Sequence, residues 1–416
     1  MIPIKFVGEN VPQPLAGEPR SPATAALQYL QPGALNLTAL PPLSLYVHWP
    51  WCVRKCPYCD FNSHEGKREL PEKDYLDALR LDLEQSLPLI WGRKIHTVFI
   101  GGGTPSLMSA AGLDRLMSDL RTLLPLELDA EITMEANPGT FEAERFKSYR
   151  ESGINRLSIG IQSFNPAHLK ALGRIHDGDE ALRAVEIAKN TFDNFNLDLM
   201  YALPSQTLAE ARHDLETALA FAPPHLSLYH LTMEPNTVFA KYPPALPDDD
   251  LSADMQDMIA EVTGVAGYDH YEVSAYARAG RRARHNLNYW QFGDYLGIGA
   301  GAHSKISFPH RILRQARYKQ PASFIEAAKR GNPVQEEHEI GRTDMGFEFM
   351  LNTLRLTGGF DPNLFGERTG MSINTITKSL NEAEAKGLIY RDHKLIKPTE
   401  LGQRFLSDLQ EVFLGE

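Results

Sequence analysis

Cysteine is scarce in this sequence: its 416 residues include three, and all three lie between Cys52 and Cys59. An odd number of thiols in so long a chain does not make the disulfide framework that is typical of small secreted domains. The sequence also lacks an apolar run long enough to span a membrane, and its N-terminus lacks a charged-then-apolar secretory signal. We therefore expect a protein of the reducing cytosol, which suits thiolate ligands.

Positive charge is also in short supply. The formal net charge is -11, which argues against non-specific binding of nucleic acid, because such binding requires a basic face. Hydrophobic residues make up 43% of the chain, enough for a sizeable core. A chain of this length is expected to form two or three domains.

The three cysteines follow a CxxxCxxC pattern, Cys52, Cys56 and Cys59, within the stretch WCVRKCPYCDF. Three thiolates on one loop can bind three irons of a [4Fe–4S] cluster, so that the fourth iron stays open to a small molecule. S-adenosylmethionine carries an amino and a carboxylate group that form a chelate of suitable size. A zinc knuckle with His48 or His64 as fourth ligand is the alternative, although structural zinc usually pairs two distant knuckles.

Short β-rich runs alternate with helical patterns after the first 42 residues, which are rich in Pro, Ala, Gly and Leu and are interpreted as an extended arm. This alternation predicts parallel strands joined by helices, and six such units favour an open, partial barrel over a closed eight-unit one. The predicted strands are Leu43–His48, Thr97–Ile100, Glu131–Glu135, Arg156–Ile161, Asn196–Tyr201 and His225–His230. The predicted helices are Asp74–Ser86, Leu113–Leu123, Phe141–Ser152, Asp179–Asn190 and Leu208–Phe221, with Asp179 and Thr207 as N-caps.

Conspicuous polar groups and glycines lie in or directly after these strands, where α/β proteins of parallel sheets place their reactive groups. Gly101, Gly102 and Gly103 allow a close backbone approach to a cofactor, although an ordinary strand-to-helix turn has the same composition. The side chains that could contact the cofactor are Tyr46, Tyr58, Thr104, Glu135, Gln162, Arg174 and Asp198. Each also has a plain structural interpretation, such as aromatic packing for the tyrosines and a solvated strand end for Glu135.

The remainder of the chain divides into two parts. The stretch from Met233 to Arg330 is expected to be irregular, and it contains His285 in the segment HNLNYW, just after Arg281, Arg282 and Arg284. A histidine can ligate haem iron and arginines can pair with propionates, although a satisfied polar histidine is the simpler interpretation. From about Asp344 the chain is expected to be helical. A helix at Asn374–Lys386, then a two-stranded wing and a closing helix, outline a winged-helix unit without a basic excess, which favours a structural or partner-docking role over nucleic-acid recognition.

Six motifs together resemble the radical S-adenosylmethionine superfamily. They are YVHWPWCVRKCPYCDF, GGGTP, MEANPGT, GIQSF, LGRIH and HNLNYW. Within the superfamily they are similar to the oxygen-independent coproporphyrinogen III oxidase-like branch, and most of all to its haem chaperones of the HemW type. The resemblance runs from about Leu43 to the C-terminus.

The resemblance implies an α/β fold, namely a partial (β/α)6 barrel with a C-terminal, mostly helical, winged-helix-like domain. The expected domains are an extension at 1–42, the barrel at 43–235, a barrel-completing or linking region at 236–335 and the C-terminal domain at 336–416. It implies cluster ligation by Cys52, Cys56 and Cys59, and haem binding by His285. The S-adenosylmethionine contacts that it implies are Tyr46, Gly102, Gly103, Thr104, Glu135, Gln162, Arg174 and Asp198.

One departure separates two branches of this family. The dehydrogenase carries a further cysteine two residues after the third, where this chain has Phe61. The resemblance therefore favours a cytoplasmic haem chaperone that delivers haem to acceptor haemoproteins and takes electrons for its cluster from a donor. Radical decarboxylation of coproporphyrinogen propionates is the alternative function. Neither function involves nucleic acid or a transmembrane segment, and peripheral contact with a membrane stays open.

Overall fold

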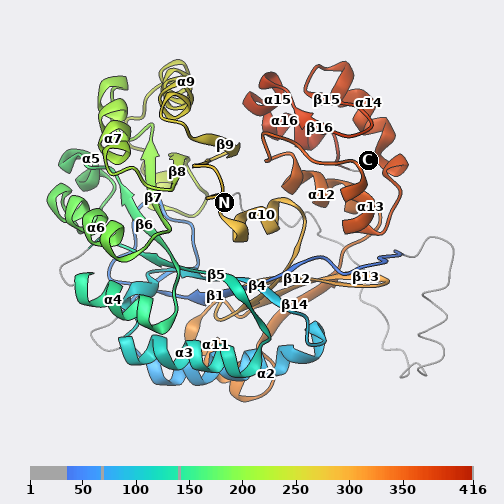
Figure 1. Ribbon diagram of the computed structural model, residues 1–416, viewed down its shortest axis with the longest axis horizontal. Helices are drawn as coiled ribbons and strands as arrows, with labels where there is room; N and C mark the ends of the chain where they lie inside the picture. The colour runs from blue at the N-terminus through green and yellow to red at the C-terminus, as the bar shows by residue number, and fades with distance from the viewer. Residues whose placement is uncertain (1–34, 67–69, 139–141, 415–416) are drawn as a thin grey trace.

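The computed structural model describes residues 35–66, 70–138 and 142–414, and it is built around one curved sheet of 12 strands. Six neighbouring strands of the sheet are parallel and joined by helices, which confirms the predicted open barrel (Figure 1). These strands are β1 (Leu43–Trp49), β4 (Ile95–Gly102), β5 (Leu126–Ala136), β6 (Arg156–Gln162), β7 (Phe195–Tyr201) and β8 (His225–His230). The helices between them are α2 (Glu72–Ile90), α3 (Ala110–Leu123), α4 (Glu142–Ser152), α5 (Pro166–Ala171), α6 (Gly178–Thr191) and α7 (Leu208–Ala220).

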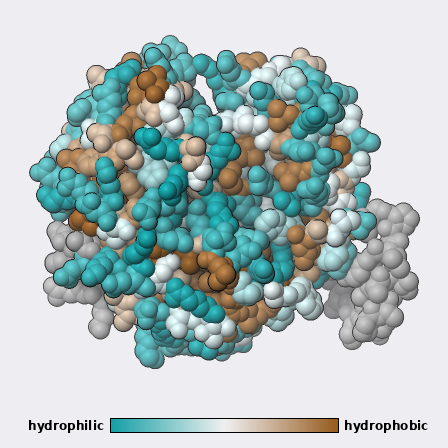
Figure 2. Space-filling view, viewed as in Figure 1, coloured by the Kyte–Doolittle hydropathy of each residue, from teal (hydrophilic) through white to brown (hydrophobic). Residues whose placement is uncertain are grey.

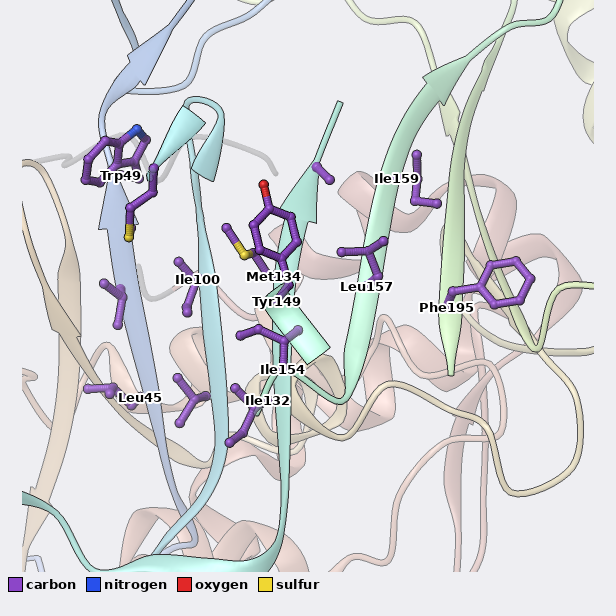
Figure 3. Close-up of a cluster of buried hydrophobic side chains, with 14 of the residues drawn as sticks. Leu45, Trp49, Ile100, Ile132, Met134, Tyr149, Ile154, Leu157, Ile159 and Phe195 are labelled. Carbon is purple, nitrogen blue, oxygen red and sulfur yellow. The ribbon is translucent and has the colours of Figure 1, made fainter. Parts of the chain in front are cut away.

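The two faces of the parallel strands differ in chemistry because side chains alternate along each strand. Apolar residues such as Trp49, Ile100, Met134 and Leu157 form the convex face, where they pack with the surrounding helices (Figure 3). The opposite, concave face carries the alternate residues, many of which are polar. The helices that cover the convex face therefore leave the concave face to hold the functional groups.

In the described part of the chain, two helices begin with the capping box, in which a side chain and the backbone of the first turn exchange hydrogen bonds. Thr207 caps α7 with Glu210 as its partner, as predicted. The predicted cap Asp179 is wrong, because Asp177 caps α6 and Glu180 completes the box. Asp179 lies one position inside the first turn, where its negative charge still favours the helix N-terminus.

The expectation of an irregular stretch from Met233 to Arg330 is also wrong, since this part of the chain extends the sheet at both edges. Strand β11 pairs in parallel with β1, and β10 pairs antiparallel with β8. The pattern is hard to find in the sequence because these strands are short, and the edge strand β14 is almost entirely polar and exposed. The elements are α8 (Val238–Lys241), α9 (Asp249–Val265), β9 (Asp269–Glu272), β10 (Ala275–Ala277), α10 (Arg284–Trp290), β11 (Asp294–Ile298), β12 (His303–Phe308), β13 (Arg311–Arg317), α11 (Pro321–Lys329) and β14 (Val334–Glu339).

Buried ion pairs join this extension to the barrel. The Asp294 carboxylate, which has no solvent exposure, accepts hydrogen bonds from Lys305 at 3.0 Å and from Arg93 at 2.8 Å. On α2, Asp82 pairs with the equally buried Arg317 of β13 at 3.2 Å. Because removing one member of such a pair would leave an uncompensated buried charge, these contacts tie the added strands to the parallel core.

The C-terminal unit has the predicted order of a helix, a two-stranded wing and closing helices, and it packs around its own apolar cluster. Its elements are α12 (Met345–Thr353), α13 (Asn363–Thr369), η2 (Ile373–Ile376), α14 (Thr377–Ala385), β15 (Ile389–Arg391), β16 (Ile396–Pro398), α15 (Glu400–Arg404) and α16 (Leu406–Glu411). Since β14 continues the barrel sheet to Glu339, we propose that this unit begins after that residue rather than at 336.

The described end of the expected N-terminal arm docks on this unit. Leu35 and Leu37 are buried in its apolar cluster, and the Asn36 amide donates to the carbonyl of Gly370 at 3.3 Å. The first 34 residues of the arm lie outside the described part of the chain.

The C-terminal unit and the α7–α9 side of the barrel stand on either side of a surface notch, which is surrounded mainly by hydrophilic residues (Figure 2). An ion pair between Arg404 of α15 and Asp257 of α9 links the two sides at 2.8 Å. No helix in the described residues is long and apolar enough to cross a membrane.

Candidate functional site

The three cysteines lie on the loop that follows β1, at the carboxyl end of the parallel strands. The loop is held by the short strands β2 (Trp51–Cys52) and β3 (His64–Glu65), which pair in parallel. The Gly66 amide donates to the Cys52 carbonyl at 2.8 Å, and the Cys59 amide donates to the Cys56 carbonyl at 3.2 Å. All three thiols are unpaired and partly exposed, so they remain accessible to a ligand.

The three thiols have different surroundings, and among the described residues only Cys56 has a positively charged side chain in contact with its sulfur. The Sγ atom of Cys56 lies 3.7 Å from a guanidinium nitrogen of Arg174, and that of Cys59 lies 3.9 Å from the Ser63 hydroxyl. Burial raises the pKa of the Cys52 and Cys59 thiols, so that nearby positive charge or bound metal is needed to favour their thiolate forms.

A zinc knuckle with His48 as its fourth ligand is not favoured by this geometry, whereas the other candidate, His64, has an Nε2 atom without a hydrogen-bond partner among the described residues. The Nε2 atom of His48 donates to the Asn62 carbonyl and its Nδ1 accepts from the Tyr46 hydroxyl, each at 2.9 Å, so both ring nitrogens are engaged. Among the described residues, no three His, Cys, Asp or Glu side chains converge to hold a single metal ion. The cysteines of a [4Fe–4S] cluster bind different irons, so their sulfurs need not meet at one point.

The glycines at the end of β4 and directly after it are required by close backbone packing against the cysteine loop. Gly102 has φ +117°, and a Cβ atom there would lie 2.6 Å from the His48 ring. A Cβ atom on Gly103 would lie 2.6 Å from the Trp51 carbonyl oxygen. The amides of Gly103 and Thr104 donate to the carbonyls of Trp49 and Trp51, at 2.6 Å and 2.8 Å. The glycine turn therefore holds the start of the cysteine loop, and larger residues would displace it.

A chain of polar contacts connects this turn to a cysteine. The Asn137 amide group donates to the Thr104 hydroxyl at 3.0 Å and accepts from Arg174 at 2.6 Å, while Arg174 reaches Cys56. The chain thus brings the predicted Thr104 and Arg174 together across three strands. Asn137 is a site residue that sequence reasoning missed, although it belongs to the MEANPGT motif and follows the predicted Glu135 by two positions.

Two predicted carboxylates and a strained glutamine lie on the concave face near the turn. Glu135 accepts a hydrogen bond from the Gly102 amide at 3.0 Å, and burial, reinforced by the charge of Asp198, raises the pKa of Glu135 to about 8. Asp198 accepts from Ser158 at 2.9 Å and from Asn196 at 2.8 Å, and burial raises its pKa. Gln162 has φ +67°, a left-handed backbone conformation that is uncommon for a residue other than glycine.

The wall formed by β1 and β4 is aromatic. The ring of Tyr46 lies 6.2 Å from that of Phe99, which in turn stacks on the imidazole of His285 at 5.0 Å. Because His48 contacts Tyr46 on the other side, rings extend from the glycine turn down to His285. The ring of the other predicted tyrosine, Tyr58, lies 6.3 Å from that of Phe239 of α8. This contact agrees with the structural alternative for Tyr58, namely aromatic packing.

His285 lies on α10 against the concave face and is 3% exposed. Its Nδ1 atom lies 2.8 Å from the hydroxyl of Thr97, whose own proton is donated to Ser44 at 2.7 Å. Thr97 therefore accepts from Nδ1–H, and the lone pair of the neutral imidazole resides on Nε2, which has no hydrogen-bond partner in the described structure. Burial, and then the charge of Arg156, lowers the pKa of His285 to about 3, so that the ring is neutral at cellular pH.

Two aromatic residues of the HNLNYW segment, and two of the arginines at its start, contact other parts of the protein. Tyr289 lies edge-on to His285 at 5.0 Å, and the indole of Trp290 lies under Arg355 of the C-terminal unit at 4.3 Å. Arg282 pairs with Asp269, and Arg284 donates to the Asp129 carbonyl at 2.7 Å. The segment thus joins the barrel to the C-terminal unit. Its buried ring nitrogens without a partner among the described residues are Nε2 of His285 and Nε1 of Trp290, and only the former carries a lone pair that can bind a metal.

Comparison with known proteins identifies relatives along almost the whole chain. Residues 46–218 match the model of the radical SAM superfamily, and residues 340–405 match that of the HemN C-terminal domain. The protein named heme chaperone HemW from Escherichia coli (strain K12) is 48% identical over 382 residues, which cover 91% of this chain and 100% of the relative. The Haemophilus influenzae heme chaperone HemW is also 48% identical, over 91% of this chain and 99% of the relative.

A third relative is more distant: the Bacillus subtilis heme chaperone HemW is 35% identical, over 90% of this chain and 99% of its own length. Among solved structures, the radical SAM enzyme coproporphyrinogen III oxidase (HemN) from Escherichia coli superimposes with a TM-score of 0.78. That structure is 24% identical and is covered over 93% of its length, with 94% of this chain included, so the likeness concerns the fold.

Proposed function

This chain belongs to the radical SAM superfamily and, within it, to the family of HemW heme chaperones, and from that membership we propose that it is a haem chaperone. The proposed cargo is haem, which the protein would hold and pass to acceptor haemoproteins in the cytoplasm. The observation that supports the proposal most directly is His285, a buried, neutral histidine with a free Nε2 lone pair.

The proposed cluster ligands are Cys52, Cys56 and Cys59. A bound cluster supplies one-electron chemistry and an iron position for the amino-acid end of S-adenosylmethionine. The chain's own part is to hold and orient these groups: Arg174 places positive charge beside Cys56, and the glycine turn holds the loop in position. A partner protein that donates electrons to the cluster is part of the proposal.

The proposed contacts to S-adenosylmethionine are the predicted Tyr46, Gly102, Gly103, Thr104, Glu135, Gln162, Arg174 and Asp198. All of them lie around the carboxyl ends of the parallel strands or on the concave face below, as the family resemblance leads one to expect. Glu135 offers a carboxylate to a cationic ligand, and ionisation of that carboxyl group is opposed by burial until such a charge arrives.

Haem ligation by His285 follows the usual arrangement of a metal-bound histidine. One ring nitrogen of such a residue donates to a protein acceptor, which fixes the ring and leaves the other nitrogen for the metal. Thr97 is that acceptor here, and its own hydroxyl donates to Ser44, which also accepts a hydrogen bond from Asn288. The aromatic wall of Phe99 and Tyr46 offers a flat apolar surface to a macrocycle.

The test is haem titration of the anaerobically reconstituted protein, followed by its Soret and low-temperature electron resonance spectra. We expect His285→Ala to weaken haem binding at least tenfold and to change the axial-ligand signature. The control is His213→Ala, since His213 is an exposed histidine on α7. Unchanged haem spectra and affinity in His285→Ala would remove this residue from the haem site.

The same preparation distinguishes the alternative, radical decarboxylation of coproporphyrinogen III. Phe61, at the position of the dehydrogenase's additional cysteine, argues against it. An anaerobic assay with coproporphyrinogen III, S-adenosylmethionine and reductant should yield no protoporphyrinogen IX beyond a stoichiometric trace. Formation of that product over many turnovers would replace the chaperone proposal with an enzymatic one.

A further inference from the structure

Two buried hydrogen-bond donors on the concave face have no partner among the described residues. They are Nε of Arg156, whose side chain belongs to a residue 3% exposed, and Oγ1 of Thr133, a residue with no exposure. Burying an unsatisfied polar group costs free energy, and a buried charge without a partner costs more. Donors without a partner therefore indicate a position where a ligand could supply the missing hydrogen-bond acceptor.

The two residues face each other across neighbouring strands. Thr133 of β5 is the Cα partner of Arg156 of β6, so their side chains lie next to each other on the same face. On its other side Thr133 is the Cα partner of Phe99, against which His285 stacks. His285, Thr133 and Arg156 therefore belong to one layer of the concave face, with the free Nε2 atom at one end and the guanidinium at the other.

The charge of Arg156 is not neutralised by a salt bridge in the described part of the chain. The carboxylates on adjacent strands make their hydrogen bonds to other groups: Glu131 accepts from the His285 amide at 3.1 Å, and Asp198 accepts from Ser158 and Asn196. The charge of Arg156 favours the ionised form of Asp198 without a direct contact between the two side chains. A guanidinium and a hydroxyl, both with free hydrogens, match the oxygens of a carboxylate. The site thus has the charge and the donors for one organic acid group.

We propose that Arg156 and Thr133 form a carboxylate anchor on the concave face, which binds a propionate group of the tetrapyrrole. This inference rests on the proposed haem-binding function and specifies how the macrocycle is oriented. The propionate would cancel the buried charge of Arg156 and accept from Thr133, while the iron faces His285. The anchor would recognise the acid group of metal-free porphyrins as well, because it makes no use of the iron.

The experiment measures binding of protoporphyrin IX and of its dimethyl ester to the full-length, cluster-reconstituted protein by fluorescence. We expect the wild type to bind the free acid more tightly than the ester. Arg156→Gln should weaken binding of the acid by roughly tenfold to a hundredfold, the range for loss of a charge-assisted hydrogen bond, and should leave the ester unaffected. Arg156→Lys should restore part of the preference, because it retains the charge.

Thr133→Val provides a second, milder test that preserves side-chain volume. It should reduce the acid-over-ester preference by a smaller factor than Arg156→Gln, with unchanged iron and sulfide content as evidence of correct folding. If Arg156→Gln does not fold, the Arg156→Lys and Thr133→Val variants provide the test of the anchor. Equal losses for acid and ester, or no loss for either, would overturn the anchor and assign Arg156 a structural role.

The outcomes also separate this inference from the proposed function. Loss of haem binding in His285→Ala with no ester discrimination in any variant supports the chaperone proposal and refutes the anchor. Discrimination that depends on Arg156, together with unchanged haem binding in His285→Ala, supports the anchor and refutes iron ligation by His285. A wild-type protein that binds neither haem nor protoporphyrin IX refutes both.

Discussion

Replacement of Glu135 by glutamine should stabilise the protein in the absence of S-adenosylmethionine. The pKa of Glu135 is raised from 4.5 to about 8, first by burial and then by the charge of Asp198, while the Gly102 amide acts in the opposite direction. Between pH 4.5 and pH 8 the unfolded chain has lost this proton and the folded chain retains it. Stability therefore falls as pH rises through this window and levels off above about pH 8.

The size of the effect follows from the shift. One pKa unit corresponds to about 1.4 kcal/mol, so at pH 7 the carboxyl group destabilises the folded state by about 3–4 kcal/mol relative to acid conditions. Glutamine has no such proton and keeps an oxygen acceptor for the Gly102 amide. We expect the advantage of Glu135→Gln to grow by about 2 kcal/mol between pH 6 and pH 8. That corresponds to a difference of a few degrees in the melting temperature.

The assay is thermal unfolding under anaerobic conditions at pH 6 and pH 8, without S-adenosylmethionine. Glu261→Gln is the control, because Glu261 is exposed on α9 and its replacement should change the melting temperature little at either pH. A difference between Glu135→Gln and the wild type that is the same at both pH values would refute the reasoning. We further expect added S-adenosylmethionine to raise the melting temperature of the wild type more than that of the variant.

Two further predictions concern stability. Gly102→Ala should lose more stability and cluster content than Gly267→Ala, because both glycines have positive φ but only a Cβ at Gly102 meets other atoms within 4 Å; equal losses would refute the role of close packing. Asp82→Asn should destabilise by about 3–5 kcal/mol by leaving the charge of Arg317 buried and unpaired. Asp257→Asn, in the exposed pair with Arg404, should cost below about 1 kcal/mol. Chemical denaturation measures the free energy of unfolding of both variants. Similar losses of stability would contradict the difference expected between the buried and the exposed ion pair.

Much of the barrel could be predicted from the sequence because its parallel strands are bounded by clear helical patterns. Strands such as β4 and β6 have apolar residues on the convex face, and amphipathic helices follow them. The added strands β9 to β14 escaped prediction because several of them are short or polar, and because the strands that join them to the barrel pair with partners distant in sequence. Gly297 of β11, for example, lies opposite Tyr46, far away in the sequence.

Some residues of the candidate site could likewise be predicted from the sequence, and others could not. The cysteines, the glycines and Glu135 stand out by spacing and by position after predicted strands. Asn137 and Arg156 do not, because a single polar residue carries no local pattern that distinguishes a solvated side chain from a buried one. Their importance rests on contacts, or on missing contacts, that arise only when separate strands are brought together.

The sequence by itself determined the cysteine spacing, the alternation of strands and helices and the presence of a histidine in HNLNYW. Only the tertiary structure decided which nitrogen of His285 is free, because Thr97 and Ser44 come from two other elements and orient the ring. It also decided that Arg156 has no salt bridge in the described structure. Hydrogen-bond direction and desolvation depend on the positions of neighbouring atoms, and these positions are set by folding rather than by residue order.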